Sequence, residues 1–87
     1  MSVEVIGFRA EWCGPCKQLR PILDELDEEY EDVEFSHVDI AEETETVNEY
    51  SVQSVPTLVI LNDGEIQTQM TGFQQKETIE EQLTALV

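Results

Sequence analysis

Basic residues, cysteine and long apolar stretches are all scarce in this chain of 87 residues. Four Lys and Arg stand against twenty Asp and Glu, which gives a formal net charge of −16. A basic face for nucleic acid is thereby excluded, because the phosphate backbone would be repelled. The longest apolar run is Leu58 to Leu61, whereas a membrane-spanning helix needs about 20 residues. We therefore expect neither nucleic acid nor a membrane as a partner.

The length suits one small core and is too short for two, so we expect a single domain over residues 1–87. We also expect it to be a monomer. Forty per cent of the residues are hydrophobic, which is too many for a disordered acidic tail. Residues 1–8 have neither the basic head nor the long apolar stretch of a secretory signal. We therefore expect a cytoplasmic protein.

Hydrophobic periodicity predicts an α/β domain of four strands and three helices. The strands are expected at residues 3–8, 33–40, 57–61 and 65–70, and the helices at about 14–29, at 42–50 and around 79–86. Pro21 lies inside the first helix and should kink it rather than end it. Asn62-Asp63-Gly64 predicts a hairpin turn, after which Ile66 and Met70 should point inward. Strand–helix–strand units favour parallel pairing, and the hairpin adds an antiparallel edge.

Both cysteines fall in the sequence WCGPC, where the first strand ends and the first helix begins. Residues three apart on a helix lie on the same side, so Cys13 and Cys16 can close a disulfide. Unpaired N–H groups at a helix start favour a thiolate on the first of the two. We therefore predict Cys13 as the exposed nucleophile and Cys16 as the resolving thiol that releases a mixed disulfide.

Three of the four basic residues, Arg9, Lys17 and Arg20, lie close to the cysteines in the sequence. Nearby cations lower the pKa of a thiol from its free value of about 8.5. Arg9 and Lys17 are therefore expected to tune the pKa of Cys13. The alternative is that Arg20 pairs with Asp24 one helical turn away and that Lys17 is merely solvated.

Other uses of a cysteine pair fit less well. A structural zinc site needs about four ligands, and the chain has one His and no further Cys. An iron–sulfur cluster would need cysteines from two chains, and an inert disulfide suits an extracellular protein better than a cytosolic one. A reversible, redox-active disulfide with no bound metal or cofactor is favoured.

The WCGPC segment, Lys17, Pro21, Val55-Pro56-Thr57, Asn62–Glu65 and Gly72 together resemble the thioredoxin family across essentially the whole chain. The resemblance implies the thioredoxin fold and a protein-disulfide reductase that is recharged by a thioredoxin reductase-type electron donor. It also implies a cis peptide bond before Pro56, where an ordinary trans proline is the alternative. The exposed backbone of Val55 would then pair with an extended substrate segment. The implied docking groove is lined by Trp12, Gly14, Pro15, Val55, Pro56 and Gly72.

The sequence departs from the family in several respects, among them Arg9, which replaces an aromatic residue. Thioredoxins usually begin with an extra strand and helix, so we expect only the four-stranded core, in the order 2-1-3-4 with strand 4 antiparallel. Gly7 stands where many members have a buried Asp, and His37 where a Lys is common. His37 should lie beside Gly7 and is a candidate proton acceptor. The alternative is a structural histidine satisfied by a backbone carbonyl.

The acid surplus and the choice of substrate leave alternatives open. Adaptation to a high-salt cytoplasm is the economical explanation of the charge, and an acidic surface for one basic partner is the other. The general reductase competes with a dedicated donor to one enzyme, such as a ribonucleotide reductase or peroxidase. A third possibility is an interaction subunit whose surface, rather than its thiols, matters.

Overall fold

A computed structural model describes residues 2–87, so Met1, at which the predicted domain begins, lies outside the described residues. All seven predicted elements are present. In chain order they are β1 (Val3–Arg9), α1 (Gly14–Glu29), β2 (Val33–Asp39), α2 (Thr44–Glu49), β3 (Thr57–Asn62), β4 (Glu65–Thr71) and α3 (Lys76–Thr84). Helix α1 continues through Pro21, as its apolar stripe predicts.

The four strands form one sheet in the predicted order β2-β1-β3-β4. β1 and β2 are parallel, and β4 is antiparallel to its neighbour β3, as expected. β3 is also antiparallel to β1, so the expectation of parallel pairing was wrong for this strand. The reason is the length of α2: six residues of helix span about 9 Å, too little to return the chain along the sheet. β3 therefore starts where β1 ends, with Thr57 paired to Phe8.

The β3–β4 hairpin has a two-residue turn at Asp63 and Gly64, whose φ angles are 53° and 85°. Positive φ at both central residues is typical of the type I′ turn, whose twist matches that of the flanking strands. The Asp63 N–H donates to the Ser2 carbonyl at 2.7 Å, and the Ser2 N–H donates to Asp63 Oδ1 at 2.8 Å. These two bonds attach the start of β1 to the hairpin.

A register shift between Ile60 and Leu61 changes which way the start of β4 faces. The shift places Ile66 opposite Leu61, whereas Met70 pairs with Leu58. Met70 is half-buried against the α1 side of the sheet, as predicted. Ile66 is 50% exposed, so its predicted inward position was wrong. An extra residue in one strand moves a side chain to the other face.

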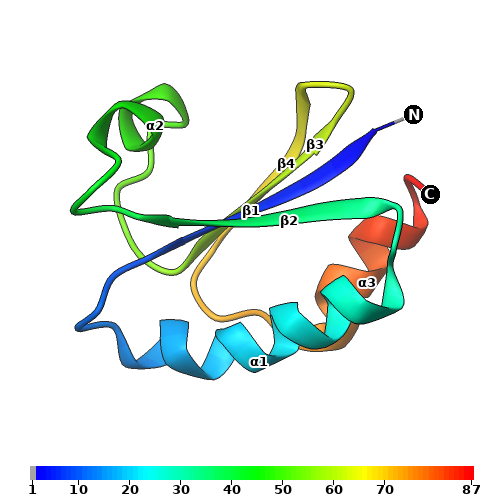
Figure 1. Ribbon diagram of the computed structural model, residues 1–87, viewed down its shortest axis with the longest axis horizontal. Coiled ribbons are helices and arrows are strands. Elements are labelled where there is room, and N and C mark those ends of the chain that lie inside the picture. Colours follow the sequence, from blue (N-terminus) through cyan, green and yellow to red (C-terminus); the bar gives the residue numbers. More distant parts are fainter. Residues whose placement is uncertain (1) are drawn as a thin grey trace.

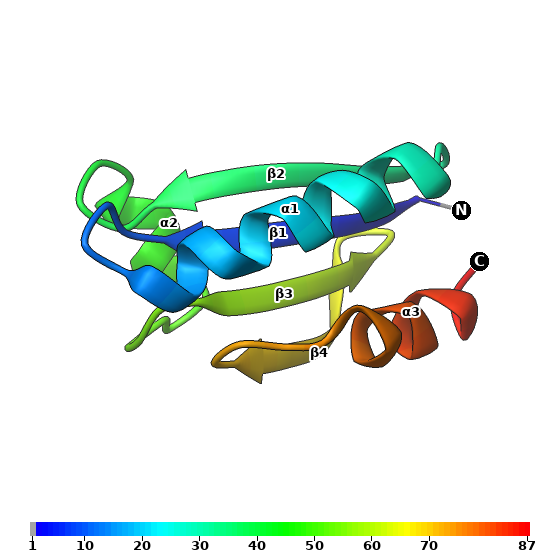
Figure 2. The ribbon, with the colours of Figure 1, turned by 90° about the horizontal axis from the view of Figure 1, so that it is seen from below.

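The helices cover the sheet unequally: α1 and α3 lie on one face and α2 on the other (Figures 1 and 2). Side chains alternate along β1 between these faces, with Val3 and Val5 toward α1 and α3, and Ile6 and Phe8 toward α2. The larger core also contains Leu19, Leu23, Leu26, Val33, Leu58, Ile60, Ile79 and Leu83. The smaller core adds Val38, Val59 and Leu61, with Val47 and Tyr50 packed against it.

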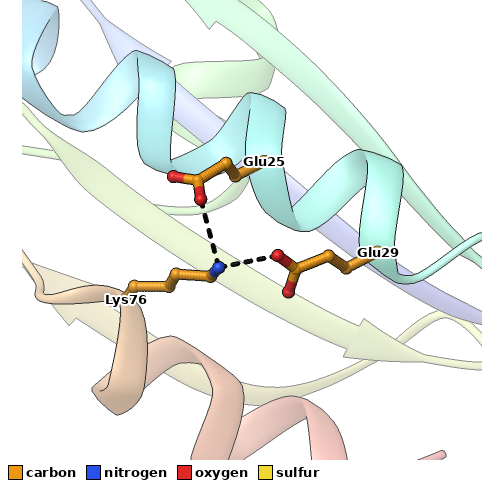
Figure 3. A network of polar contacts seen from close by, with 3 residues as sticks. All are labelled: Glu25, Glu29 and Lys76. Atoms are coloured by element: carbon orange, nitrogen blue, oxygen red, sulfur yellow. Dashed lines mark hydrogen bonds and ion pairs between the residues drawn. The ribbon is translucent and has the colours of Figure 1, made fainter.

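Lys76, at the start of α3, connects that helix to α1 (Figure 3). Its Nζ lies 3.3 Å from Glu25 Oε1 and 2.7 Å from Glu29 Oε2. The two carboxylates are one helical turn apart, so they face the same ammonium. Hydrogen bonding to Glu29, and then to Glu25, raises the pKa of Lys76 above its ordinary value.

Within residues 2–87, ion pairs to basic side chains engage only four carboxylates: Asp24, Glu25, Glu29 and Asp39. The remaining acids therefore repel one another with little local compensation, because the chain carries twenty in all.

We expect the melting temperature at pH 7 to rise markedly from 0.01 M to 1 M salt, because the Debye length falls from about 30 Å to about 3 Å. A gain of only ~2 kcal/mol moves the melting temperature of a domain this small by roughly 10 °C. Calorimetry across this range, with NaCl and KCl compared, measures the effect. A melting temperature that stays flat would show that the carboxylates do not repel one another appreciably.

Candidate functional site

The cysteine pair lies at the junction of β1 and α1. Cys13 caps α1 with an extended backbone, φ −91° and ψ 106°, and its Sγ accepts a hydrogen bond from the Cys16 N–H at 3.2 Å. Pro15, in the first turn, has no N–H to leave unpaired there. Cys13 and Cys16 form a disulfide, with their Cα atoms 5.3 Å apart. The helical spacing therefore brings the two sulfurs together, as predicted.

Both cysteines are buried in this disulfide form. Cys13 is 4% exposed and Cys16 is 7% exposed, packed with Ala10, Ile40 and Val55. The prediction that Cys13 is the exposed member of the pair was therefore wrong for this state. What distinguishes the two sulfurs is the N–H donated to Cys13 Sγ at the helix start. Such a bond favours the charged form of a thiol.

The expected docking residues meet at the same end of the sheet. The Val55–Pro56 peptide bond is cis, as the resemblance implies, and Val55 packs against the cysteines. The Gly72 N–H donates to the Pro56 carbonyl at 2.8 Å, and Gly72 has a φ of 91°, which favours glycine. Trp12, next to Cys13, is 77% exposed. Gly14 and Pro15 are exposed at the start of α1.

His37 lies opposite Gly7 in the parallel register of β1 and β2, as predicted. A Cβ atom built on Gly7 would lie 3.5 Å from His37 Nδ1 and 3.3 Å from Leu23 Cδ1. A methyl group at position 7 would therefore touch the imidazole at an ordinary contact distance and press more closely on Leu23. His37, Gly7, Cys16 and Pro56 help to line one small cavity of about 20 Å³. The structure therefore brings the candidate proton acceptor and the second cysteine to the same cavity.

The surroundings of His37 favour a neutral imidazole. Burial lowers the pKa of His37 below its ordinary value of 6.5, and the nearby cation of Arg20 lowers it further. Asp24 acts in the opposite direction, and Arg9 in the same direction as Arg20. A neutral imidazole can accept a proton at pH 7.

The basic residues gather beside Cys16 rather than Cys13. Arg9, Lys17 and Arg20 line an open hollow of about 440 Å³ that Cys16 also lines. Arg20 Nε lies 3.1 Å from Asp24 Oδ1, the pair that the one-turn spacing predicts. Arg9 Nη1 lies 4.0 Å from Asp39 Oδ2. The influence of these cations on the pKa of Cys13 stays a prediction.

Sequence reasoning missed two features of this region. Leu23 and Leu58 flank Gly7, so they help to set the space available beside His37. The Arg9 Nε atom is buried and has no hydrogen-bond partner among residues 2–87. No one-dimensional pattern signals either feature, because both depend on which elements pack together around β1.

Across the described residues, no cluster of three His, Cys, Asp or Glu side chains is placed to hold a metal ion. Between Ser2 and Val87, no helix has the length and apolar character needed to cross a membrane.

A cysteine pair that closes a disulfide at a strand-to-helix junction, beside the loop of Val55 and Pro56 on a four-stranded sheet, defines a thiol–disulfide exchange protein. The thioredoxin family profile matches residues 2–85. Thioredoxin from Bacillus subtilis is 44% identical over 92% of this chain and 78% of its own. Fasciola hepatica thioredoxin superposes with a TM-score of 0.91, at 32% identity over 99% of this chain and 82% of that chain. A mutant thioredoxin from Halobacterium salinarum gives a TM-score of 0.93, at 32% identity over 98% of this chain and 74% of that chain.

The chain belongs to the thioredoxin family. It is accordingly a thiol–disulfide oxidoreductase, an enzyme that reduces disulfides with its own cysteine pair and needs no separate cofactor.

We expect the His37 imidazole to titrate with a midpoint below 6.5, because burial and Arg20 both disfavour its charged form. Arg20→Gln should raise the midpoint, whereas Lys76→Gln, which removes one positive charge on α3, should leave it in place. NMR titration of the imidazole protons measures the midpoint. A midpoint at or above 6.5 in the unmodified chain would contradict this account of the site.

The lowered pKa of His37 also makes the stability of the fold depend on pH. Between pH 6.5 and the lower pKa of the folded state, the unfolded chain binds the His37 proton more readily than the folded chain does. The contribution of His37 to stability is therefore present above pH 6.5 and is lost as the pH falls through this window. We expect the difference in unfolding free energy between the unmodified chain and His37→Gln to shrink as the pH falls. Urea titrations at several pH values measure this difference, and a constant difference would argue against it.

Proposed function

We propose that this chain is a general protein-disulfide reductase in which Cys13 attacks and Cys16 resolves. The observation that carries the assignment is the Cys16 N–H donated to Cys13 Sγ at the start of α1. The Cys13 thiolate attacks one substrate sulfur, the substrate S–S bond breaks, and the other substrate sulfur leaves as a thiolate. Cys16, after losing its proton, attacks Cys13 Sγ and releases the second substrate thiolate. Two electrons pass to the substrate, and the chain is left with its disulfide.

Substrate docking is proposed along Trp12, Gly14, Pro15, Val55, Pro56 and Gly72. The exposure of Trp12 supports this role, because a large aromatic side chain with 77% exposure is available to a partner. The contact of Val55 with the cysteines supports it too, because a segment paired with the Val55 backbone would lie beside the reacting sulfurs.

His37 is proposed to accept the proton of Cys16 in place of the buried Asp found in many relatives. Both residues line the cavity of about 20 Å³, and a water molecule needs about 10–15 Å³ of such space. The proposed route is a water molecule in this cavity that relays the proton from Cys16 to the neutral imidazole. Arg9 and Lys17 are proposed to favour ionisation of the thiols through their positive charge.

The electron source is proposed to be a reductase of the thioredoxin reductase type, linked to NAD(P)H or ferredoxin, and the setting a reducing cytoplasm. The chain is proposed to act as a monomer and to be adapted to high salt. The uneven balance of twenty acids against four bases supports the last point, because screening would relieve the repulsion.

Cys13→Ser should abolish mixed-disulfide formation with a protein substrate, because the attacking thiolate is removed. Cys16→Ser should accumulate the mixed disulfide, because the resolving thiol is removed. Trapping on a disulfide substrate such as insulin, followed by non-reducing electrophoresis and mass spectrometry, measures both. Alkylation of the reduced protein at neutral pH provides the check: labelling of Cys16 before Cys13 would reverse the assignment.

His37→Gln should slow resolution of the mixed disulfide by about tenfold or more at pH 7, since a positioned base contributes ~10²-fold or more and water replaces it in part. Stopped-flow measurement of the resolution step gives the rate, with His37→Ala as a second variant. In the unmodified chain, the resolution rate should change with pH around the His37 midpoint. This inflection should be absent from the pH profiles of both variants. If His37 were purely structural, its replacement would instead lower stability and leave the resolution rate of the folded protein unchanged.

A further inference from the structure

The open hollow beside Cys16 has more positive charge than the rest of this acidic chain would lead one to expect. We call it the basic hollow; it is lined by Arg9, Ala10, Glu11, Cys16, Lys17 and Arg20. Three of the four basic residues of the chain line it, against one carboxylate.

The cations of the basic hollow are only loosely engaged by the protein itself. Lys17 makes no ion pair or side-chain hydrogen bond within residues 2–87. The buried Nε of Arg9 has no hydrogen-bond partner in that same range, and its nearest carboxylate contact, to Asp39, is 4.0 Å long. Arg20 pairs with Asp24, but both side chains are about half exposed, so that pair contributes little. Lys76, the fourth base, is instead held by Glu25 and Glu29.

The basic hollow lies next to the residues that carry out the exchange reaction. Arg9, Cys16 and Arg20 line both the hollow and the smaller cavity that contains His37. A negatively charged group bound there would lie beside the resolving cysteine while the substrate is attached to Cys13. The chain as a whole has a net charge of −16, so most of its surface repels an acidic partner. The cations of the basic hollow can instead attract a short acidic segment of a partner.

We propose that the basic hollow is a subsite for the carboxylate of an Asp or Glu that flanks the substrate disulfide. The chain then prefers protein disulfides with acidic flanks. The inference rests on the proposed reductase function and adds to it a preference among substrates, while the order of the exchange steps stays the same. Arginine is suited to a carboxylate because its planar N–H groups match the two oxygens, and Lys17 adds a second charge.

The test uses two peptides that contain the same disulfide and differ only in whether Glu or Gln flanks each cysteine. The quantity measured is the ratio of kcat/KM for the Glu peptide to that for the Gln peptide. Effects of a substitution on thiol reactivity cancel in this ratio, because both peptides react with the same thiols. The variants are Lys17→Gln, Arg20→Gln and the double variant. Lys76→Gln is the matched control, since it makes the same change in net charge on a different helix.

At about 0.1 M salt, where the Debye length is ~10 Å, we expect the unmodified chain to prefer the Glu peptide. Each single variant should lower the ratio about two- to fivefold, the range for one exposed charge pair. The double variant should lose the preference, and Lys76→Gln should keep it.

A ratio of one in the unmodified chain, or a ratio unaffected by Lys17→Gln and Arg20→Gln, overturns the subsite while leaving the reductase function intact. An equal drop in Lys76→Gln overturns it as well, because net charge alone would then explain the preference. Failure to reduce either peptide, or insulin, overturns the reductase function itself.

Discussion

Burial of β1 and β3 on both of their faces is the constraint on which the rest of this small structure depends. Val5 and Ile60 pack under α1 and α3, while Phe8 and Val59 pack toward α2, and all four are essentially inaccessible to solvent. Each side chain of this size contributes about 1.5–3 kcal/mol when fully buried. In a chain with a net charge of −16, this apolar contribution must exceed both conformational entropy and charge repulsion.

The two buried strands also place the chemistry. β1 ends at Arg9, and α1 begins at Gly14, so the intervening turn puts Cys13 at the start of a helix that is anchored on the larger core. β3 begins at Thr57, beside the end of β1, and this brings Val55 and Pro56 to the cysteines. The antiparallel direction of β3 is therefore needed at the site, because a parallel β3 would carry Pro56 to the opposite end of β1.

Acidic and basic side chains lie in different parts of the molecule. Acidic side chains crowd the exposed face of α1 and the segment after β2, whereas Arg9, Lys17 and Arg20 gather beside Cys16. Lys76 is the exception among the bases, since it connects α3 to α1 through Glu25 and Glu29. A protein with few cations thus has most of them where thiols react. After burial, two of these cations, Arg20 and Arg9, also lower the pKa of His37, which links the electrostatics of the surface hollow to those of the smaller cavity that contains His37.

The amino-acid sequence by itself determined the seven elements, the cysteine pair, the hairpin turn and the proximity of Gly7 to His37. Each of these depends on local spacing: the period of apolar residues, three residues between sulfurs, or positions counted along paired strands. Only the tertiary structure decided the direction of β3, the outward position of Ile66, the burial of Cys13 and the basic hollow. These depend on the short span of α2, an extra residue within the β3–β4 pairing, and the way α1 lies across the sheet. Such features depend on how the elements pair and pack in three dimensions, and no periodicity in the sequence records them.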